Sequence, residues 1–396
     1  MAKESMSAAP AFNLGSLAAS LASVTDPRVV GRTAHDLGDV LAIAIGALMA
    51  GASGWDDMEE WASHHRATLA LWLDLRGGVP SGDTLRRVLS AIDFAELSAC
   101  FQEWAAGIPA GCAPGAPRVV ALDGKCVRGS RRPSAGRKLG IHQLSAYVAG
   151  QGICLAQRDC SEEKSNEIAA IKNILPSLDL AGAIVTIDAM GTHADIASLV
   201  AAGGGDWLLP IKGNQPLLEE AVGQFFGWWE IGRPEGHGVA EFIEGLEVEH
   251  GRESTRRCLA TSELSWMGLM GLGKGWTGLR SIAMVESEGV RDGKPWAQRR
   301  IYLSSMAADP AAILAASRAH WSIENGLHWV LDVAFGEDAC RVWNMRAAKN
   351  LSLLRKIAFN LLRGWEPSAK ACSMPKKMKM VDRDAGHAMS LISQLF

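Results

Sequence analysis

The sequence predicts a mixed α/β protein preceded by an all-helical domain. Apolar residues recur at helical spacing through residues 1–110. A stretch rich in Gly, Pro and Ala, "GIPAGCAPGAP" (107–117), then interrupts this pattern. Beyond it, short apolar runs alternate with helical segments, which is typical of a mixed sheet whose inner strands are buried on both faces.

The expected helices of the first domain each have a recognisable start. "HDLGDVLAIAIGALMAGAS" (35–53) is almost uniformly apolar after a polar beginning, which predicts a buried helix. "DDMEEWASHHRATLALWLDL" (56–75) opens with acids, and "GVPSGDTLRRVLSAIDFAELSACFQEWA" (78–105) opens with a Pro-Ser start signal. Arg86 and Arg87 could enter a DNA groove from such a helix pair, although most helix pairs only pack.

After residue 117 the pattern is strand, hairpin, helix, strand, helix, strand, helix. We expect strands in "RVVALDG", on both sides of the turn "AGQG" (149–152), in "GAIVTIDAM" and in "DWLLPIKGNQ". We expect helices in "SNEIAAIKNILPSL", with Ser165 as its cap, in "THADIASLVAAGG" and in "PLLEEAVGQFFGWW". The predicted domains are 1–110, helical; 117–235, the first part of an α/β catalytic core; 236–305, a β-rich insertion; 306–365, helices that complete the core; and 366–396, a basic tail.

Composition indicates an ordinary globular protein. The 396 residues are 48% hydrophobic and 21% charged, with a net charge of −3. The longest apolar candidate, Leu41–Gly54, is shorter than the ~20 residues of a membrane span. The N-terminus lacks a secretory pattern, and the eight Cys contain no CxxC pair, so we expect a cytoplasmic protein with reduced thiols.

Positive charge is concentrated at the C-terminal end. Residues 1–116 and 117–338 have net charges of −6 and −5, whereas residues 339–396 have a net charge of +8. A basic segment on an acidic body is a plausible phosphate-binding surface, but it can equally be a solvated tail without a partner.

Two apolar strands each end on one Asp: "VVALDG" on Asp123 and "AIVTIDAM" on Asp188. Active sites of open α/β sheets lie at the carboxyl ends of the strands. Two carboxylates from neighbouring strands can share a hard divalent cation such as Mg²⁺. Taken alone, either Asp can be a salt-bridged strand end or a turn residue.

A third acid is expected from "RAHWSIENGLHWVLDVAFGED" (318–338). Glu324 lies beside the buried stripe of this predicted helix, and His328 and Asp332 follow at i+4 and i+8 on the same side. The alternative is an intrahelical contact between Glu324 and His328. Zinc chemistry is less favoured, because no H-E-x-x-H spacing is present.

Several cations and polar residues flank these acids and are candidate contacts to a polyanion. Lys212 could instead cap the following helix, and the alternating charges of "HGRESTRR" could form a solvated strand face. The predicted DNA-binding residues are Lys125, Arg128, Arg131, Arg132, Lys212, Asn214, Arg252, Arg256, Arg257 and His328.

The motifs occur together in a known arrangement. "VVALDGKCVRGS", "VTIDAMGTHADIA", "WLLPIKGNQP", "HGRESTRR", "AHWSIENGLHWVLDVAFGEDACR" and "AAKNLSLLRKIAFNLL" appear in this order over residues 117–365. The chain thereby resembles the DDE transposases of bacterial insertion sequences, and within them the H-repeat-associated group found beside Rhs elements. It departs from related patterns at Gly82, His193, Ser317 and His320, where His, Gln, Tyr and Arg are more usual.

This resemblance implies a ribonuclease-H-like core in which Asp123, Asp188 and Glu324 are the catalytic, metal-binding triad for two Mg²⁺ or Mn²⁺ ions. It implies an enzyme that cleaves and transfers DNA strands, with terminal inverted repeats and target DNA as partners, working as a dimer near the nucleoid and not in a membrane. The alternatives are an inactive DNA-binding remnant or inhibitor of transposition, and a nuclease on the same fold.

Overall fold

A computed structural model describes residues 17–29, 31, 33–108, 117–131, 140–160, 167–233, 238–249, 252–291, 293–368 and 371–393. The chain divides into two compact units. Unit 1 comprises Met1–Pro114, Gly124–Asn166 and Glu324–Phe396, and unit 2 comprises Gly115–Asp123 and Glu167–Ile323. The first predicted domain therefore lies within unit 1, the β-rich segment 236–305 lies within unit 2, and residues 117–235 are divided between the two.

Unit 1 is mostly helical. Its N-terminal helices are α1 (Leu17–Ala22), α2 (Leu37–Ala50), α3 (Trp55–His64), α4 (Arg66–Leu69), α5 (Gly82–Ala91) and α6 (Phe94–Ala106). Its later segments add the antiparallel hairpin of β2 (Ile141–Val148) and β3 (Ile153–Asp159), then the π-helical turn η6 (Glu324–His328), α12 (Trp329–Val333), α13 (Met345–Gly364), α14 (Met374–Arg383) and α15 (Ala385–Ser393). The all-helical start and the hairpin around "AGQG" are as predicted.

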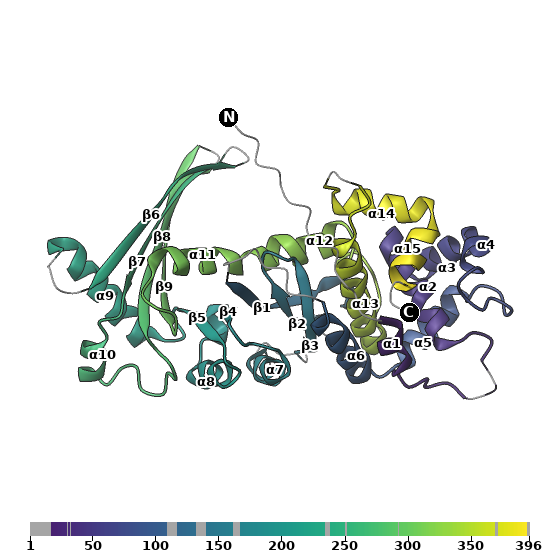
Figure 1. Ribbon diagram of the computed structural model, residues 1–396, viewed down its shortest axis with the longest axis horizontal. Coiled ribbons are helices and arrows are strands. Elements are labelled where there is room, and N and C mark those ends of the chain that lie inside the picture. The colour runs from purple at the N-terminus through teal and green to yellow at the C-terminus, as the bar shows by residue number, and fades with distance from the viewer. Residues whose placement is uncertain are drawn as a thin grey trace. The chain divides into compact units, whose positions relative to one another are not determined.

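The core of unit 1 forms around α13 and α2. Fifteen of the sixteen residues of α13 from Ala347 to Leu362 are buried, the exception being Lys349, and α2 has only short polar ends. Asp36 caps the start of α2 by accepting from the Gly38 N–H, and Gly51, with φ 103°, ends it. Helices α2, α5, α6 and α14 contact α13, as can be followed in Figure 1.

Residues 366–396 differ from the predicted basic tail. They include α14 and α15, which contact α2. Met378, Val381, Ala388, Met389 and Ile392 recur at helical spacing and are buried, and this apolar stripe is the reason that the segment packs rather than remaining solvated. The other described basic residues of this segment, Lys376, Lys379 and Arg383, are exposed, whereas Lys377 is buried.

Unit 2 contains the α/β core. Its elements are the first half of β1 (Arg118–Val127), α7 (Glu167–Ile174), β4 (Ala183–Ile187), α8 (Ala194–Ala202), β5 (Asp206–Ile211), α9 (Pro216–Gly232), β6 (Val239–Glu249), β7 (Arg252–Thr261), α10 (Ser265–Leu269), β8 (Ser281–Arg291), β9 (Lys294–Ser304) and α11 (Pro310–His320). Unit 2 also contains the short 3₁₀ turns η4 (Leu175–Ser177) and η5 (Ala189–Gly191), whereas the 3₁₀ turn η1 (Arg128–Ser130) belongs to unit 1.

Strands β1, β4 and β5 are parallel neighbours, and all five residues of β4 are buried. Figure 1 shows α11 on one face of β4 and β5 and α7 and α8 on the other, which explains the uniformly apolar sequence "AIVTI". The helices after β4 and β5 end at Gly203 and begin at Pro216 as predicted, whereas the predicted cap Ser165 lies outside the described residues.

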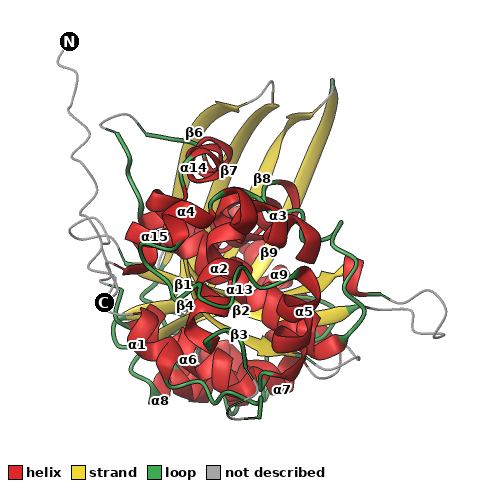
Figure 2. Ribbon diagram, turned by 90° about the vertical axis from the view of Figure 1, so that its right-hand side faces the viewer, coloured by secondary structure: helices red, strands yellow, loops and turns green. Residues whose placement is uncertain are grey.

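The β-rich segment consists of long strands that continue the core sheet. Strand β9 pairs antiparallel with β5, and β8, β7 and β6 follow in turn, so that the order among the described residues is β3-β2-β1-β4-β5-β9-β8-β7-β6. Figure 2 shows β6 to β9 side by side. The sheet, with parallel β1, β4 and β5 and with helices before it in the chain, confirms the predicted mixed α/β fold class.

Among the described residues, no single helix has the length and hydropathy to cross a membrane. Helices α2 and α3 have the required length and hydropathy only when they are counted together, although the chain bends by 95° between them. This result depends on length and composition alone.

Candidate active site

The two predicted aspartates follow paired strand residues. Strands β1 and β4 run parallel with Leu122 opposite Ile187, so Asp123 and Asp188 come next at the same edge. Strand β1 does not end at Asp123 as predicted but continues to Val127. The reason is that β1 lies between β2 and β4 in the sheet and can pair on both edges, which an apolar-run prediction does not reveal.

Asp188 is in an environment that disfavours its charge. Burial raises its pKa, and the nearby carboxylates of Glu167 and Asp123 raise it further. The backbone N–H groups of Gly191 and Met190 partly oppose this shift, and Gly191 N donates to Asp188 at 3.2 Å. Clustered carboxylates repel one another, and a bound cation would relieve that repulsion.

Glu324 and His328 lie on the π-helical turn η6 rather than on a regular α-helix. Nδ1 of the buried His328 is 3.4 Å from Oε2 of the exposed Glu324, which confirms the intrahelical contact considered above. Gly326 allows η6 to approach β2, because a Cβ at this position would lie 2.3 Å from the hydroxyl of Tyr147. Such π turns are frequent at functional sites.

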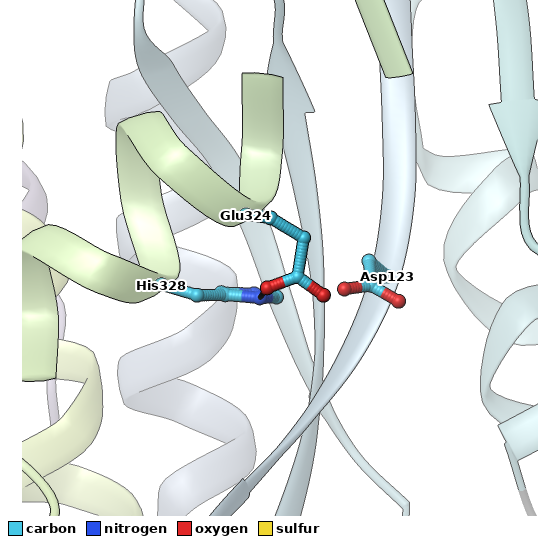
Figure 3. A group of neighbouring side chains, drawn as sticks. All are labelled: Asp123, Glu324 and His328. Atoms are coloured by element: carbon cyan, nitrogen blue, oxygen red, sulfur yellow. Dashed lines mark ion pairs between the residues drawn. The ribbon is translucent and has the colours of Figure 1, made fainter. Parts of the chain in front are cut away.

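Asp123, Glu324 and His328 form a group that can hold a metal ion. Their ligand atoms all lie within 4.8 Å of one another. Figure 3 shows the three side chains pointing toward one another. Two carboxylates and one imidazole suit a divalent cation, and the oxygens favour a hard one such as Mg²⁺ or Mn²⁺. The group contains two of the three predicted ligands. The predicted ligand Asp188 is not part of this group. The group instead includes His328, which was predicted as a DNA contact.

Lys125 is engaged by acids of its own unit. Its side chain is only 11% exposed, and Nζ lies 2.6 Å from Asp332 Oδ1, 2.8 Å from Glu337 Oε2 and 3.5 Å from Asp338 Oδ1. Glu337, Asp338 and the pairing role of Asp332 were not foreseen in the sequence, because only the folded chain brings "FGED" beside β1.

The other cations near β1 are exposed. Arg128 is 84% exposed, with Nε 3.6 Å from Asp338 Oδ2, and Arg131 is exposed beside it. Arg132 lies outside the described residues. Arg128 and Arg131 thus remain accessible to a polyanion.

The arginines of β7 are already compensated by glutamates. Arg256 pairs with Glu244 and Glu247, and Arg257 pairs with Glu230, Glu241 and Glu286. For Arg252 the structure describes only the backbone, which pairs with Glu249. The strand register, which the sequence does not reveal, sets these cross-strand pairs.

A cavity of about 420 Å³ in unit 2 opens beside Asp188. Lys212 lines it from the end of β5, and Arg299 and Arg300 line it from β9. The antiparallel pairing of Ile211 with Ile301 brings these cations together. The Arg300 guanidinium lies 4.3 Å from the ring centroid of Trp321, which also lines the cavity. Sequence reasoning missed Arg299, Arg300 and Trp321, and the only signal for the two arginines was the doublet in "AQRRIYLSS".

Asn214 has a structural contact beside this cavity. Its Nδ2 donates to the carbonyl of Ala189 at 2.6 Å and to that of Thr192 at 3.4 Å. Asn214 therefore holds the segment that follows Asp188. Lys212 is exposed and does not act as the side-chain cap of α9.

Comparisons with known proteins identify the class to which this fold and site belong. Residues 114–361 match the family described as "Transposase DDE domain", and residues 18–105 match the family described as "DDE_Tnp_1-associated". The chain belongs to the DDE-domain transposases and is an enzyme of that type.

Curated relatives place the chain more narrowly. It is 34% identical over 391 residues to the "H repeat-associated putative transposase YhhI" of Escherichia coli K12, covering 96% of this chain and 99% of the relative. It is 35% identical over 363 residues to the "Putative transposase YncI" of Escherichia coli O157:H7, covering 89% and 88%. The predicted resemblance to the H-repeat-associated group is confirmed.

Among solved structures, a piggyBac transposase synaptic complex with hairpin DNA matches with a TM-score of 0.45 and 13% identity, covering 96% of this chain and 78% of that one. The family matches favour a DDE transposase over the two alternatives, since they extend over both the helical domain and the α/β core.

Proposed function

We propose that this enzyme cleaves DNA at the ends of an insertion sequence and joins the freed 3′-hydroxyl to target DNA. Asp123, Asp188 and Glu324 are its catalytic acids, and His328 completes the ligand set. The observation that carries this proposal is the pairing of β1 with β4, after which Asp123 and Asp188 follow at one sheet edge. Burial there, together with the nearby carboxylates of Glu167 and Asp123, raises the pKa of Asp188.

The proposed site holds two Mg²⁺ or Mn²⁺ ions, with Asp123, Glu324 and His328 around one and Asp188 beside them. When bound, such ions would activate the attacking hydroxyl and stabilise the charge of the leaving oxygen. The chain itself contributes the ligands and their placement: a sheet edge holds the aspartates, and the turn η6 presents Glu324 and His328 from one helical face.

Unit 2 also offers a place for the DNA backbone next to Asp188. Lys212 is exposed at the mouth of the cavity, and Arg300 stacks on Trp321, so that a phosphate can meet cations while a sugar or base meets apolar walls. Arg128 and Arg131 are further exposed contacts, and we assign Arg132 and Arg252 to the same role from the sequence alone.

The salt dependence of DNA binding tests these contacts. We expect Lys212→Gln and Arg131→Gln each to weaken binding and to reduce the slope of log K against log salt by about one. Arg257→Gln is the comparison, because three glutamates already neutralise that guanidinium. Fluorescence anisotropy with end DNA at several salt concentrations measures the slopes. Equal slopes for all four proteins would remove Lys212 and Arg131 from the interface.

The activity itself is tested with a labelled duplex carrying the element end and a supercoiled plasmid. With Mg²⁺ or Mn²⁺ we expect joined products, and none after chelation by EDTA. Cuts without joining would indicate a nuclease, and binding without cuts would indicate a remnant or inhibitor.

The working form is proposed to be a dimer that brings two ends together in the cytoplasm, where chromosomal DNA is accessible. The helical domain, residues 1–110, would bind the end. Light scattering of the protein with and without end DNA gives the stoichiometry, and a one-to-one complex would contradict the dimer.

A further inference from the structure

The buried ions of unit 1 form one connected network. Lys125 on β1 contacts Asp332 on α12 and Glu337 and Asp338 in the segment that follows α12. Glu337 is fully buried, and its second oxygen accepts from Ser352 Oγ at 2.8 Å on α13. The buried Lys356, one turn later, donates to the same hydroxyl at 3.1 Å.

The charged state of Lys125 is favoured by its carboxylate partners. Burial alone would lower the pKa of Lys125, but Glu337 and Asp332 outweigh it and raise that pKa. The segment that follows α12 is also held close to the backbone of Arg128 and Gly129. Arg128 N donates to Asp338 Oδ1 at 2.9 Å, and a Cβ on Gly129 would lie 2.2 Å from the carbonyl oxygen of Cys340, so no side chain fits between them.

The network is attached to the elements that carry the metal ligands. Lys125 follows Asp123 by two residues on β1, and side chains at i and i+2 of a strand point to the same face. Asp332 follows His328 by four residues, one helical turn away. The Lys125–Asp332 contact therefore connects the strand of one ligand with the helical segment of the other two.

We propose that Lys125, Asp332 and Glu337 are positioning residues, a buried ionic clamp that sets Asp123 and the turn η6 for metal binding. This inference rests on the proposed function of Asp123, Glu324 and His328. It replaces the predicted role of Lys125 as a DNA contact, because an ammonium that is 11% exposed among three carboxylates is not presented to a phosphate.

Mn²⁺ binding to the full chain without DNA, followed by electron paramagnetic resonance, tests the clamp. We expect Lys125→Met and Asp332→Asn to raise the Kd for Mn²⁺ by about ten- to a hundredfold, as loss of groups behind metal ligands commonly does. Lys125→Arg retains the charge and should recover part of the affinity. An ammonium is not a metal ligand, so an effect of Lys125→Met cannot be lost coordination.

Lys349→Met is the matched control, because it removes another lysine of unit 1 that is paired with one acid, Asp159, at 2.5 Å. We expect no change in its Mn²⁺ affinity. End-DNA affinity and its salt slope should stay the same in Lys125→Met. A lower salt slope together with an unchanged Kd for Mn²⁺ would overturn the clamp in favour of a DNA contact.

Asp332→Asn decides the question if Lys125→Met does not fold, because Asp332 is one-third exposed and the Lys125–Glu337 pair is retained. An unchanged Kd for Mn²⁺ in folded Asp332→Asn would overturn the clamp. Asp123→Asn is measured alongside. If that variant also binds Mn²⁺ normally, the proposed metal site fails, whereas normal binding in the clamp variants alone rejects only the clamp.

Discussion

Asp188→Asn should reduce strand cleavage by about three orders of magnitude or more and leave end-DNA binding unchanged. The amide keeps the size and the acceptor oxygen that faces Gly191 N, but it loses the negative charge needed to hold a cation. Single-turnover cleavage of a labelled end, with anisotropy on the same DNA, measures both quantities.

Asp195→Asn is the control for this prediction. Asp195 lies in the first turn of α8 in the same unit, is exposed and pairs with Lys172. Its replacement should leave the cleavage rate near that of the wild type. Substantial cleavage by Asp188→Asn would show that Asp188 is a strand-end acid without a catalytic role.

Glu337→Ala should lower the free energy of unfolding by about 3–5 kcal/mol, because it leaves buried cations without their counter-charge. Glu337 is 0% exposed and accepts from Lys125 and Ser352, and Lys356 also acts on its charge. Urea denaturation monitored by tryptophan fluorescence measures the loss. Asp74→Asn, at an exposed ion pair with Arg76, should show no comparable loss in moderate salt.

The same carboxyl predicts how stability depends on pH. Burial would raise the pKa of Glu337, but Lys356, Lys125 and Arg355 outweigh burial and lower it to about 2 from 4.5. A depressed pKa stabilises the fold above the unfolded value and loses that contribution as pH falls from about 4.5 towards 2. Wild-type stability should fall across this range, and Glu337→Gln should lack this part of the decline. Parallel declines would contradict the assignment.

Much of the fold was predictable because it depends on local patterns. The uniformly apolar "AIVTI" predicts a strand buried on both faces. Pro216 marks a helix start because its fixed φ suits the first turn, and Gly204, with φ 74°, follows the end of α8 in a conformation that favours glycine; neither restriction depends on tertiary context. The segment 366–396 was misjudged because its net charge was weighed more than its buried apolar stripe.

The cations show the limit of such reasoning most clearly. Lys125, Arg128 and Arg257 are equivalent in sequence, as basic residues near acids. In the structure Arg128 is exposed, Lys125 is held by three carboxylates and Arg257 by three glutamates. Their partners lie between 16 and more than 200 residues away, so no local pattern contains them.

The sequence by itself determined the family, the α/β core and the three candidate acids, because motifs and apolar periodicity are properties of contiguous residues. Only the tertiary structure decided that His328 joins Asp123 and Glu324, that Arg299 and Arg300 meet Lys212, and that Lys125 lies inside a buried network. The physical reason is that charge compensation and ligand geometry depend on strand register and helix packing between distant segments.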